Sequence, residues 1–298
     1  MMRGMHRMCG IHGMHRVCRK SDLAGLLFVL PSLLGTAVFL LAPLLDVMRR
    51  SFTEAVGGGW VGLNNYRTIF RNSAFLLAGK NTIRFTVICI PMLLALSLFL
   101  AVFLHRQKKT GSFLKSAFLV PMAIPCASVV LLWRFLFQNQ GMLNGVLVGF
   151  HMEGRDWMNS NAAFWVLVFS YLWKNLGYDI VLWIAGLSSI PESIYEAARV
   201  DGAGEWKCFT GITLPNLLPS LYTISTLSFL NSFKVFREAY LVAGDYPHES
   251  MYLMQHLFNN WFRELDLDKM AAAAVVNGVI IFILILFLQK AWDDKGDV

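Results

Sequence analysis

LSSIPESIYEAARVDGAGEWKCFTGITLP occupies residues 187–215 and interrupts an otherwise apolar part of the chain. Long apolar runs flank it, from Phe164 to Leu187 and from Ile212 to Phe233. The stretch predicts two short helices. Pro191 suits a first helical position, acidic residues follow it near the positive end of the helix, and Gly202 can adopt the positive φ that ends the helix. The sequence therefore predicts a polar, helical loop between two apolar helices.

The composition of the whole chain is typical of a membrane protein. Of 298 residues, 56% are hydrophobic and 15% are charged, whereas soluble domains carry about 25% charged residues. A helix needs about 20 apolar residues to cross the hydrocarbon core, and its backbone polar groups must be satisfied internally. We therefore expect an all-α integral membrane protein rather than a soluble enzyme, a disulfide scaffold or a disordered chain. Six transmembrane helices are expected, at Leu23–Leu45, Thr82–Leu104, Phe113–Phe137, Phe164–Leu187, Ile212–Phe233 and Ala271–Leu288.

Basic residues set the expected orientation. The first 20 residues carry five basic and no acidic side chains, and the cluster Arg106–Lys109 follows the second apolar run. Because basic residues are retained on the cytoplasmic side, residues 1–22 and 290–298 are expected to be cytoplasmic tails of a multi-pass protein. The first apolar run is longer than the core of a secretion signal, so we expect an uncleaved helix. The net charge of +7 then reflects topology and anionic lipid, with no nucleic-acid partner expected.

Residues 187–215 also resemble a known family. Glu196-Ala197-Ala198, then Gly202, then Ile212-Thr213-Leu214-Pro215 are similar to the EAA signature of permease subunits in bacterial ATP-binding-cassette importers. Ile190-Pro191, Asp201-Gly202-Ala203 and Phe209 resemble the branch that imports oligosaccharides and related solutes such as glycerol phosphate. Weaker similarity extends to Val61–Tyr66, Asn81-Thr82 and Phe233–Phe236.

This resemblance implies a type I importer fold, with an ABC-type transmembrane domain over residues 23–289, its core over 77–289, and a cytoplasmic EAA coupling helix. In such a loop Glu196 would pair with a basic residue of an ATPase subunit. Ala197 and Ala198 would pack into its groove, and Gly202 would make the bend. The complete coupling set implied by position is Glu196, Ala197, Ala198, Asp201, Gly202, Ala203, Ile212, Leu214 and Pro215.

The resemblance also implies partners in a bacterial inner or plasma membrane. These are a second permease subunit forming a heterodimer, two ATPase subunits, and an extracytoplasmic solute-binding protein. ATP and Mg²⁺ would be bound by the ATPase subunits, and this chain would bind no cofactor. No phosphate-binding loop of the form Gly-x4-Gly-Lys-Ser/Thr occurs, since Gly79-Lys80 is followed by Asn81. We expect a transport subunit without catalytic residues.

Polar residues inside the apolar runs are candidates for a substrate path, because such residues usually face a cavity or a partner. In the fourth run, Tyr171 shares one helical face with three candidates, and the fifth run carries two more. The candidates are Asn175, Tyr178, Asp179, Ser228 and Asn231. The alternative is hydrogen bonding between helices, or an internal ion pair of Asp179 with Lys174 or Arg134.

Several weaker patterns leave alternatives open. Residues 243–247 read AGDYP, without the glycine pair often found there in the sugar branch, so a non-sugar importer remains an alternative. His151 and Asp156 have the spacing of a membrane acyltransferase pair, which is the enzyme alternative. Pro121 and Pro125 are expected to kink the third apolar helix. No metal site is expected, because the spacing of Cys9, His12, His15 and Cys18 is unlike that of paired zinc ligands.

Overall fold

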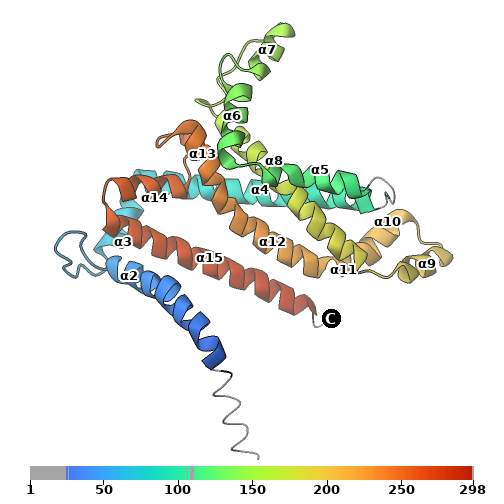
Figure 1. Ribbon diagram of the computed structural model, residues 1–298, viewed down its shortest axis with the longest axis horizontal. Coiled ribbons are helices and arrows are strands. Elements are labelled where there is room, and N and C mark those ends of the chain that lie inside the picture. Colours follow the sequence, from blue (N-terminus) through green and yellow to red (C-terminus); the bar gives the residue numbers. More distant parts are fainter. Residues whose placement is uncertain (1–24, 26, 106, 108–110, 297–298) are drawn as a thin grey trace, which may run out of the picture.

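The structure is a computed structural model that describes residues 25, 27–105, 107 and 111–296. Over these residues the chain is helical, and an isolated bridge between Thr53 and Trp60 is the only β-type pairing that they form. Figure 1 shows long helices lying side by side, with α7 projecting beyond one side of the bundle and α9 and α10 beyond one end.

The helices have the following bounds. They are α2 (Ala42–Arg50), α3 (Asn64–Arg71), α4 (Ser73–His105), α5 (Gly111–Ala123), α6 (Cys126–Phe137), α7 (Met142–Gly149), α8 (Ala162–Ser188), α9 (Glu192–Val200), α10 (Glu205–Cys208), α11 (Leu214–Asn216), α12 (Leu218–Ser232), α13 (Phe236–Ala243), α14 (Met254–Arg263) and α15 (Leu267–Gly296). Two π-helical turns, η1 (Ala37–Leu41) and η2 (Phe209–Thr213), and two 3-10 turns, η3 (Phe233–Val235) and η4 (Glu249–Met251), complete the elements.

Three helical segments of the described chain are long and apolar enough to cross a membrane: Leu27–Arg50, Ser73–His105 and Leu267–Phe287. The helices Lys115–Ala123 and Cys126–Gly149 form a bent pair, and counting this pair as one span raises the number of candidate spans in the described chain to four. α8 is 27 residues long but carries charged and amide side chains, and α12 has only 15 residues. The all-α membrane fold is confirmed, while the full number of six crossings stays a prediction.

The third apolar run is not one helix, which corrects the expected span Phe113–Phe137. α5 and α6 are separated at Ile124 and Pro125, and the two halves of the bent pair meet at 96°. Pro125 has ψ 141°, outside the helical region, and a proline also disfavours helical backbone at the residue before it. The kink expected at Pro125 is confirmed as a complete break, whereas Pro121 stays inside α5.

α4 and α8 form the centre of the bundle. Phe85 and Leu93 of α4 are buried against Phe164 and Tyr171 of α8 in one apolar cluster. α5 approaches α8 closely at Gly177, where an added Cβ would lie 1.8 Å from the carbonyl oxygen of Phe118. Only glycine permits this backbone approach, which is a common device between membrane helices.

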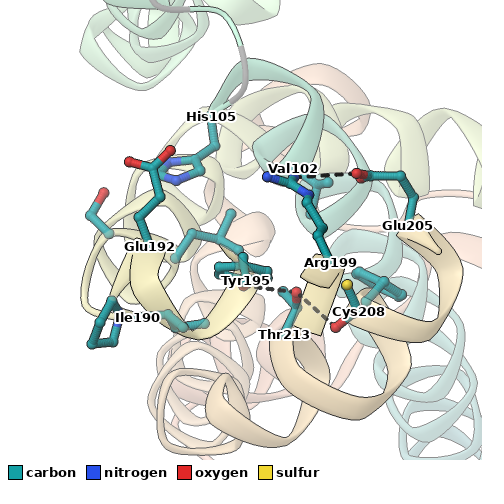
Figure 2. Close-up of a pocket in the computed structure, with 13 residues that line it drawn as sticks. Val102, His105, Ile190, Glu192, Tyr195, Arg199, Glu205, Cys208 and Thr213 are labelled. Atoms are coloured by element: carbon teal, nitrogen blue, oxygen red, sulfur yellow. Dashed lines mark hydrogen bonds and ion pairs between the residues drawn. The ribbon is translucent and has the colours of Figure 1, made fainter. Parts of the chain in front are cut away.

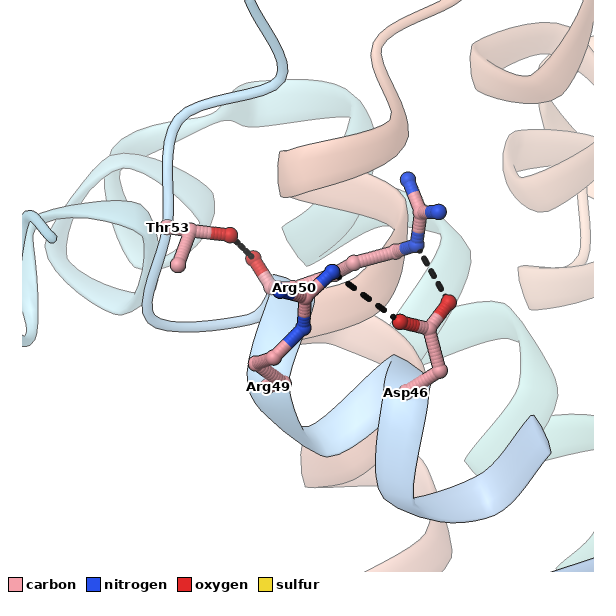
Figure 3. A network of polar contacts seen from close by, with 4 residues as sticks. All are labelled: Asp46, Arg49, Arg50 and Thr53. Carbon is pink, nitrogen blue, oxygen red and sulfur yellow. Dashed lines mark hydrogen bonds and ion pairs between the residues drawn. The ribbon is translucent and has the colours of Figure 1, made fainter. Parts of the chain in front are cut away.

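The outer faces of the bundle are apolar and exposed. Phe28 and Phe39 of the first span are 92% and 84% exposed, and Phe287 of α15 is 70% exposed. Exposed apolar side chains of this kind suit the hydrocarbon core of a membrane. At the end of the first span, Asp46 accepts hydrogen bonds from Arg49 (3.3 Å) and Arg50 (2.6 Å), as Figure 3 shows. These pairs compensate the carboxylate charge.

Val61–Tyr66 and Asn81-Thr82, which showed the weaker family similarity, each contain an asparagine with a structural role. Both asparagines lie at the end of the bundle formed by α3 and α14. The Asn65 amide donates to the carbonyl oxygens of Ser51 (3.1 Å) and Thr53 (2.9 Å). The Asn81 amide donates to the carbonyl oxygens of Glu249 (2.6 Å) and Tyr252 (3.0 Å). These asparagines fix the connections before α3 and α14, because each satisfies backbone groups that no helix satisfies.

Candidate functional site

The loop between α8 and α12 contains the expected short helices. α9 begins at Glu192. The sequence predicted Pro191 as the first residue of this helix, but its ψ of 133° is extended, so Pro191 is the residue that precedes the helix. The Pro191 carbonyl accepts the backbone N–H of Ile194 at 3.2 Å. Glu192 lies in the first turn, where its charge is favourable next to the unpaired N–H groups.

α9 ends in a Schellman motif. Gly202 has φ 80°, its N–H donates to the Arg199 carbonyl at 3.0 Å, and the Ala203 N–H donates to the Ala198 carbonyl at 2.9 Å. The positive φ expected of Gly202 is confirmed. The chain then turns sharply into α10, so both helices project together beyond the ends of α8 and α12 (Figure 1).

The projecting face of this loop is exposed. α9 has no buried residue, Glu196 and Ala197 are exposed, and Ala198 is half-buried. Apolar side chains are exposed with them: Val200 is 88% and Trp206 is 76% exposed. The loop therefore presents both charged and apolar side chains on its exposed surface.

The opposite face of the loop is anchored. The hydroxyls of Tyr195 and Thr213 share a hydrogen bond at 2.9 Å, which joins α9 to η2. Arg199 and Glu205 form an ion pair at 3.3 Å between α9 and α10. Both contacts border a cavity of about 560 Å³ that extends to Val102 and His105 at the end of α4 (Figure 2).

The other residues of the expected coupling set lie at the base and bend of the loop. Ile212 packs against the buried cluster that contains Ile190 and Leu217, and so connects the loop to the bundle. Leu214 and Pro215 are exposed at the start of α11, where a proline is tolerated. Asp201 is exposed beside Gly202, with its N–H donated to the Ala197 carbonyl at 3.1 Å.

The candidate path residues separate into two groups. Asn175 and Asn231 line a second cavity of about 160 Å³. Asp179 and Ser228 are buried instead between α8 and α12, where the Ser228 hydroxyl donates to Asp179 Oδ2 at 2.8 Å. Tyr178 is half-buried on α8 and is not one of the residues that line the smaller cavity.

Lys174 and Arg134 do not pair with Asp179. Lys174 forms an ion pair with Glu238 of α13, and Arg134 donates to the Leu241 carbonyl at 3.1 Å. Sequence reasoning missed Glu238 and its neighbour Arg237, which both line the smaller cavity. The available signal was an adjacent pair of charged residues four and five positions after the apolar run that ends at Phe233.

The pair proposed for an enzyme does not form a catalytic arrangement. Asp156 accepts the backbone N–H groups of Met158 (3.2 Å) and Asn159 (2.9 Å), and the hydrogen bonds from Asn159 hold the pKa of Asp156 below its usual range. No hydrogen bond joins it to His151 within the described loop. Among the described residues no three His, Cys, Asp or Glu side chains are placed to share a metal ion; the Cys and His residues of the tail lie outside them.

The structure is a bundle of apolar helices with an anchored, exposed loop between two of its central helices, the architecture of an all-α membrane protein. The chain belongs to the family described as binding-protein-dependent transport system inner membrane component, which matches residues 93–295.

Its relatives are transport permeases. The arabinooligosaccharides transport system permease protein AraP of Bacillus subtilis is 30% identical, over 91% of this chain and 89% of AraP. The sn-glycerol-3-phosphate transport system permease protein UgpA of Escherichia coli is 31% identical, over 87% of this chain and 90% of UgpA. A bacterial ABC transporter involved in the import of alginate has the same fold, with a TM-score of 0.82 at 21% identity over 94% of this chain and 99% of that one. The chain is thus an ABC importer permease subunit and not an enzyme.

Proposed function

We propose that this chain is the permease of an importer for oligosaccharides or related sugar and polyol solutes, and that the α9–α10 loop couples it to an ATPase. The supporting observation is the loop itself, in which an exposed helix bearing Glu196 and Ala197 is held from behind by the Tyr195–Thr213 hydrogen bond. The names of AraP and UgpA, which specify an arabinooligosaccharide and a glycerol phosphate, support the solute class.

Membership in a binding-protein-dependent system means that the subunit works with other proteins. In our proposal these are a second, similar permease, two ATPase subunits that bind ATP and Mg²⁺, and an extracytoplasmic binding protein. The second permease is needed because one chain supplies only part of a closed path. Both termini and the α9–α10 loop lie on the cytoplasmic side, as the basic residues of the tail and of Arg106–Lys109 favour.

In this mechanism Glu196 pairs with a basic residue of an ATPase subunit, and Ala197 and Ala198 let its surface approach closely. Asp201, Gly202 and Ala203 form the bend. Closure of the ATPase dimer on ATP pulls the loop and shifts the helices from an inward-facing to an outward-facing arrangement. The loop then has one position in the inward-facing arrangement and another in the outward-facing arrangement, and ATP binding by the ATPase subunits favours the second.

The test is solute-stimulated ATP hydrolysis by the complete reconstituted transporter. Glu196→Ala and Gly202→Asp should abolish the stimulation, because the first removes the paired charge and the second strains a φ of 80°. Glu153→Ala, an exposed acidic residue in the loop between α7 and α8, is the matched control. Unchanged stimulation in both loop variants, with the helices still folded by circular dichroism, contradicts the coupling role.

A further inference from the structure

A cavity of about 560 Å³ lies between the end of α4 and the α9–α10 loop (Figure 2). Val102 and His105 line it from α4, and Glu192 and Glu205 line it from α9 and α10. Its volume falls in the range of about 300–1,000 Å³ that is common for small-molecule sites. A ligand in this cavity would therefore contact the helix bundle and the loop at the same time.

The lining offers apolar surface beside hydrogen-bonding groups. Tyr195 and Phe209 contribute aromatic rings, which present apolar faces. The Tyr195 hydroxyl already shares a hydrogen bond with Thr213 at 2.9 Å, so this residue offers a ligand mainly its ring. Further apolar lining comes from Val102, Leu187, Ile190 and Pro191. The cavity thus suits a ligand that has both apolar surface and polar groups.

The charged groups of the lining do not require a charged ligand. Arg199 and Glu205 form an ion pair at 3.3 Å, and their side chains are 56% and 60% exposed. Glu192 is also exposed. Because charges that remain in contact with water keep their hydration, no counter-ion has to neutralise them. What these residues provide is two carboxylates that accept hydrogen bonds and a guanidinium that donates them.

Hydroxyl groups match this set of donors and acceptors. A hydroxyl both donates and accepts, so it can bond to a carboxylate and to a guanidinium. An anion would instead meet two carboxylates, and a purely apolar ligand would leave all three charged groups unused. In a sugar the hydroxyls surround a ring whose C–H groups form apolar faces, and such faces can pack on Tyr195 and Phe209. The lining therefore favours a neutral sugar or polyol.

We propose that this cavity is a regulatory site, at which a neutral sugar or polyol from the cytoplasm binds and slows the transporter. The ligand contacts α4 and the loop together, so it stabilises the arrangement in which the cavity has this shape. Transport requires the loop to change position, and a ligand that favours one position opposes the change. Imported solute would then limit its own uptake, at a site separate from the smaller cavity at Asn175 and Asn231. This inference rests on the proposed function, which supplies the cytoplasmic position and the movement of the loop.

The test uses the complete transporter in nanodiscs without its binding protein, with maltotriose, arabinotriose and glycerol as probes and titration calorimetry as the readout. At least one probe should bind. Glu192→Gln should weaken this binding about fivefold or more, because an amide accepts hydrogen bonds less strongly than a carboxylate. Val102→Trp should abolish it by filling the cavity. Glu153→Gln and Val87→Trp are the matched controls, since both residues are exposed and neither lines the cavity.

A second measurement tests the regulatory effect. When solute-loaded binding protein stimulates ATP hydrolysis, a saturating concentration of the same probe should lower the rate at least twofold in the wild type and less in Glu192→Gln. Binding of the probe without any decrease in the rate refutes the regulatory role.

Absence of binding by all three probes overturns the proposal. So does binding that is unchanged in Val102→Trp, or that is lost in Asn231→Ala, because it then belongs to the smaller cavity. The Glu196→Ala assay on the same preparation separates the two hypotheses, since stimulation that depends on Glu196 supports the coupling function even where no probe binds.

Discussion

Substitution of Gly177 by alanine tests the closest helix contact in the bundle. A Cβ at this position would lie 1.8 Å from the Phe118 carbonyl oxygen and 3.0 Å from the Leu119 nitrogen. Both atoms are backbone, so no side-chain rotation relieves the overlap. An ordinary contact begins at 3.4 Å, so α5 must retreat from α8 by about 1.6 Å at this point.

Forced overpacking of this kind costs about 1–3 kcal/mol, and a displaced backbone belongs at the upper end. At about 2–4 °C per kcal/mol for domains of 150–250 residues, Gly177→Ala should lower Tm by about 6–12 °C. The measurement is thermal unfolding of the purified transporter complex, followed by tryptophan fluorescence. Gly278→Ala is the matched control, because Gly278 lies in an apolar helix with nothing within 4 Å of an added Cβ.

The same substitution should alter the smaller cavity. Met122 of α5 and Asn175 of α8 both line it, on either side of the contact that Gly177 permits. A retreat of α5 therefore moves one wall of the cavity, and solute-stimulated ATP hydrolysis should fall along with Tm. Gly278→Ala should unfold within 2 °C of the wild type. If Gly177→Ala does so as well, the backbones of α5 and α8 are not in close contact at this position, and the prediction is refuted.

Three further substitutions test contacts that the fold makes elsewhere. Tyr195→Phe removes the hydroxyl that shares a hydrogen bond with Thr213, which should cost about 0.5–1.5 kcal/mol. We expect reduced solute-stimulated ATP hydrolysis by a complex that still assembles. Full stimulation would show that this hydrogen bond is dispensable for coupling. Ser228→Ala leaves the buried Asp179 without its hydrogen bond, which should cost about 1–3 kcal/mol and lower Tm, so an unchanged Tm contradicts this role. Burial lowers the pKa of His256 from 6.5 to about 4. Between these pH values the unfolded chain binds a proton that the folded chain does not, so stability should fall by up to about 3 kcal/mol as the pH drops from 6.5 towards 4. His256→Asn should flatten this dependence of Tm on pH, and a wild-type Tm that does not fall with the pH would refute it.

The loop could be predicted from sequence because its signals are local. Gly202 ends α9 since a helix commonly stops at a residue with positive φ, and that rule needs no knowledge of the rest of the fold. Pro125 likewise marked the break between α5 and α6, although the angle of 96° depends on what each half packs against. In both cases the deciding residue lies within a few positions of its effect.

The polar interior could not be predicted, because its partners are distant in sequence. Lys174 pairs with Glu238, 64 residues away, in preference to Asp179 on its own helix. Asp179 instead accepts a hydrogen bond from Ser228, 49 residues away. Helical spacing indicates which side chains share a face, but the neighbour that the face meets is set by packing.

These distant contacts bear on how a pull on the loop would reach the cavity. α8 leads into the loop and α12 follows it, so the two helices are the loop's connections to the bundle. They are joined at Ser228 of α12, whose hydroxyl donates to Asp179 and whose carbonyl accepts the Tyr171 hydroxyl. Separating them would leave a buried carboxylate and a buried hydroxyl without partners, which is costly. A displacement of the loop should therefore move α8 and α12 together, and with them Asn175 and Asn231 on the cavity wall.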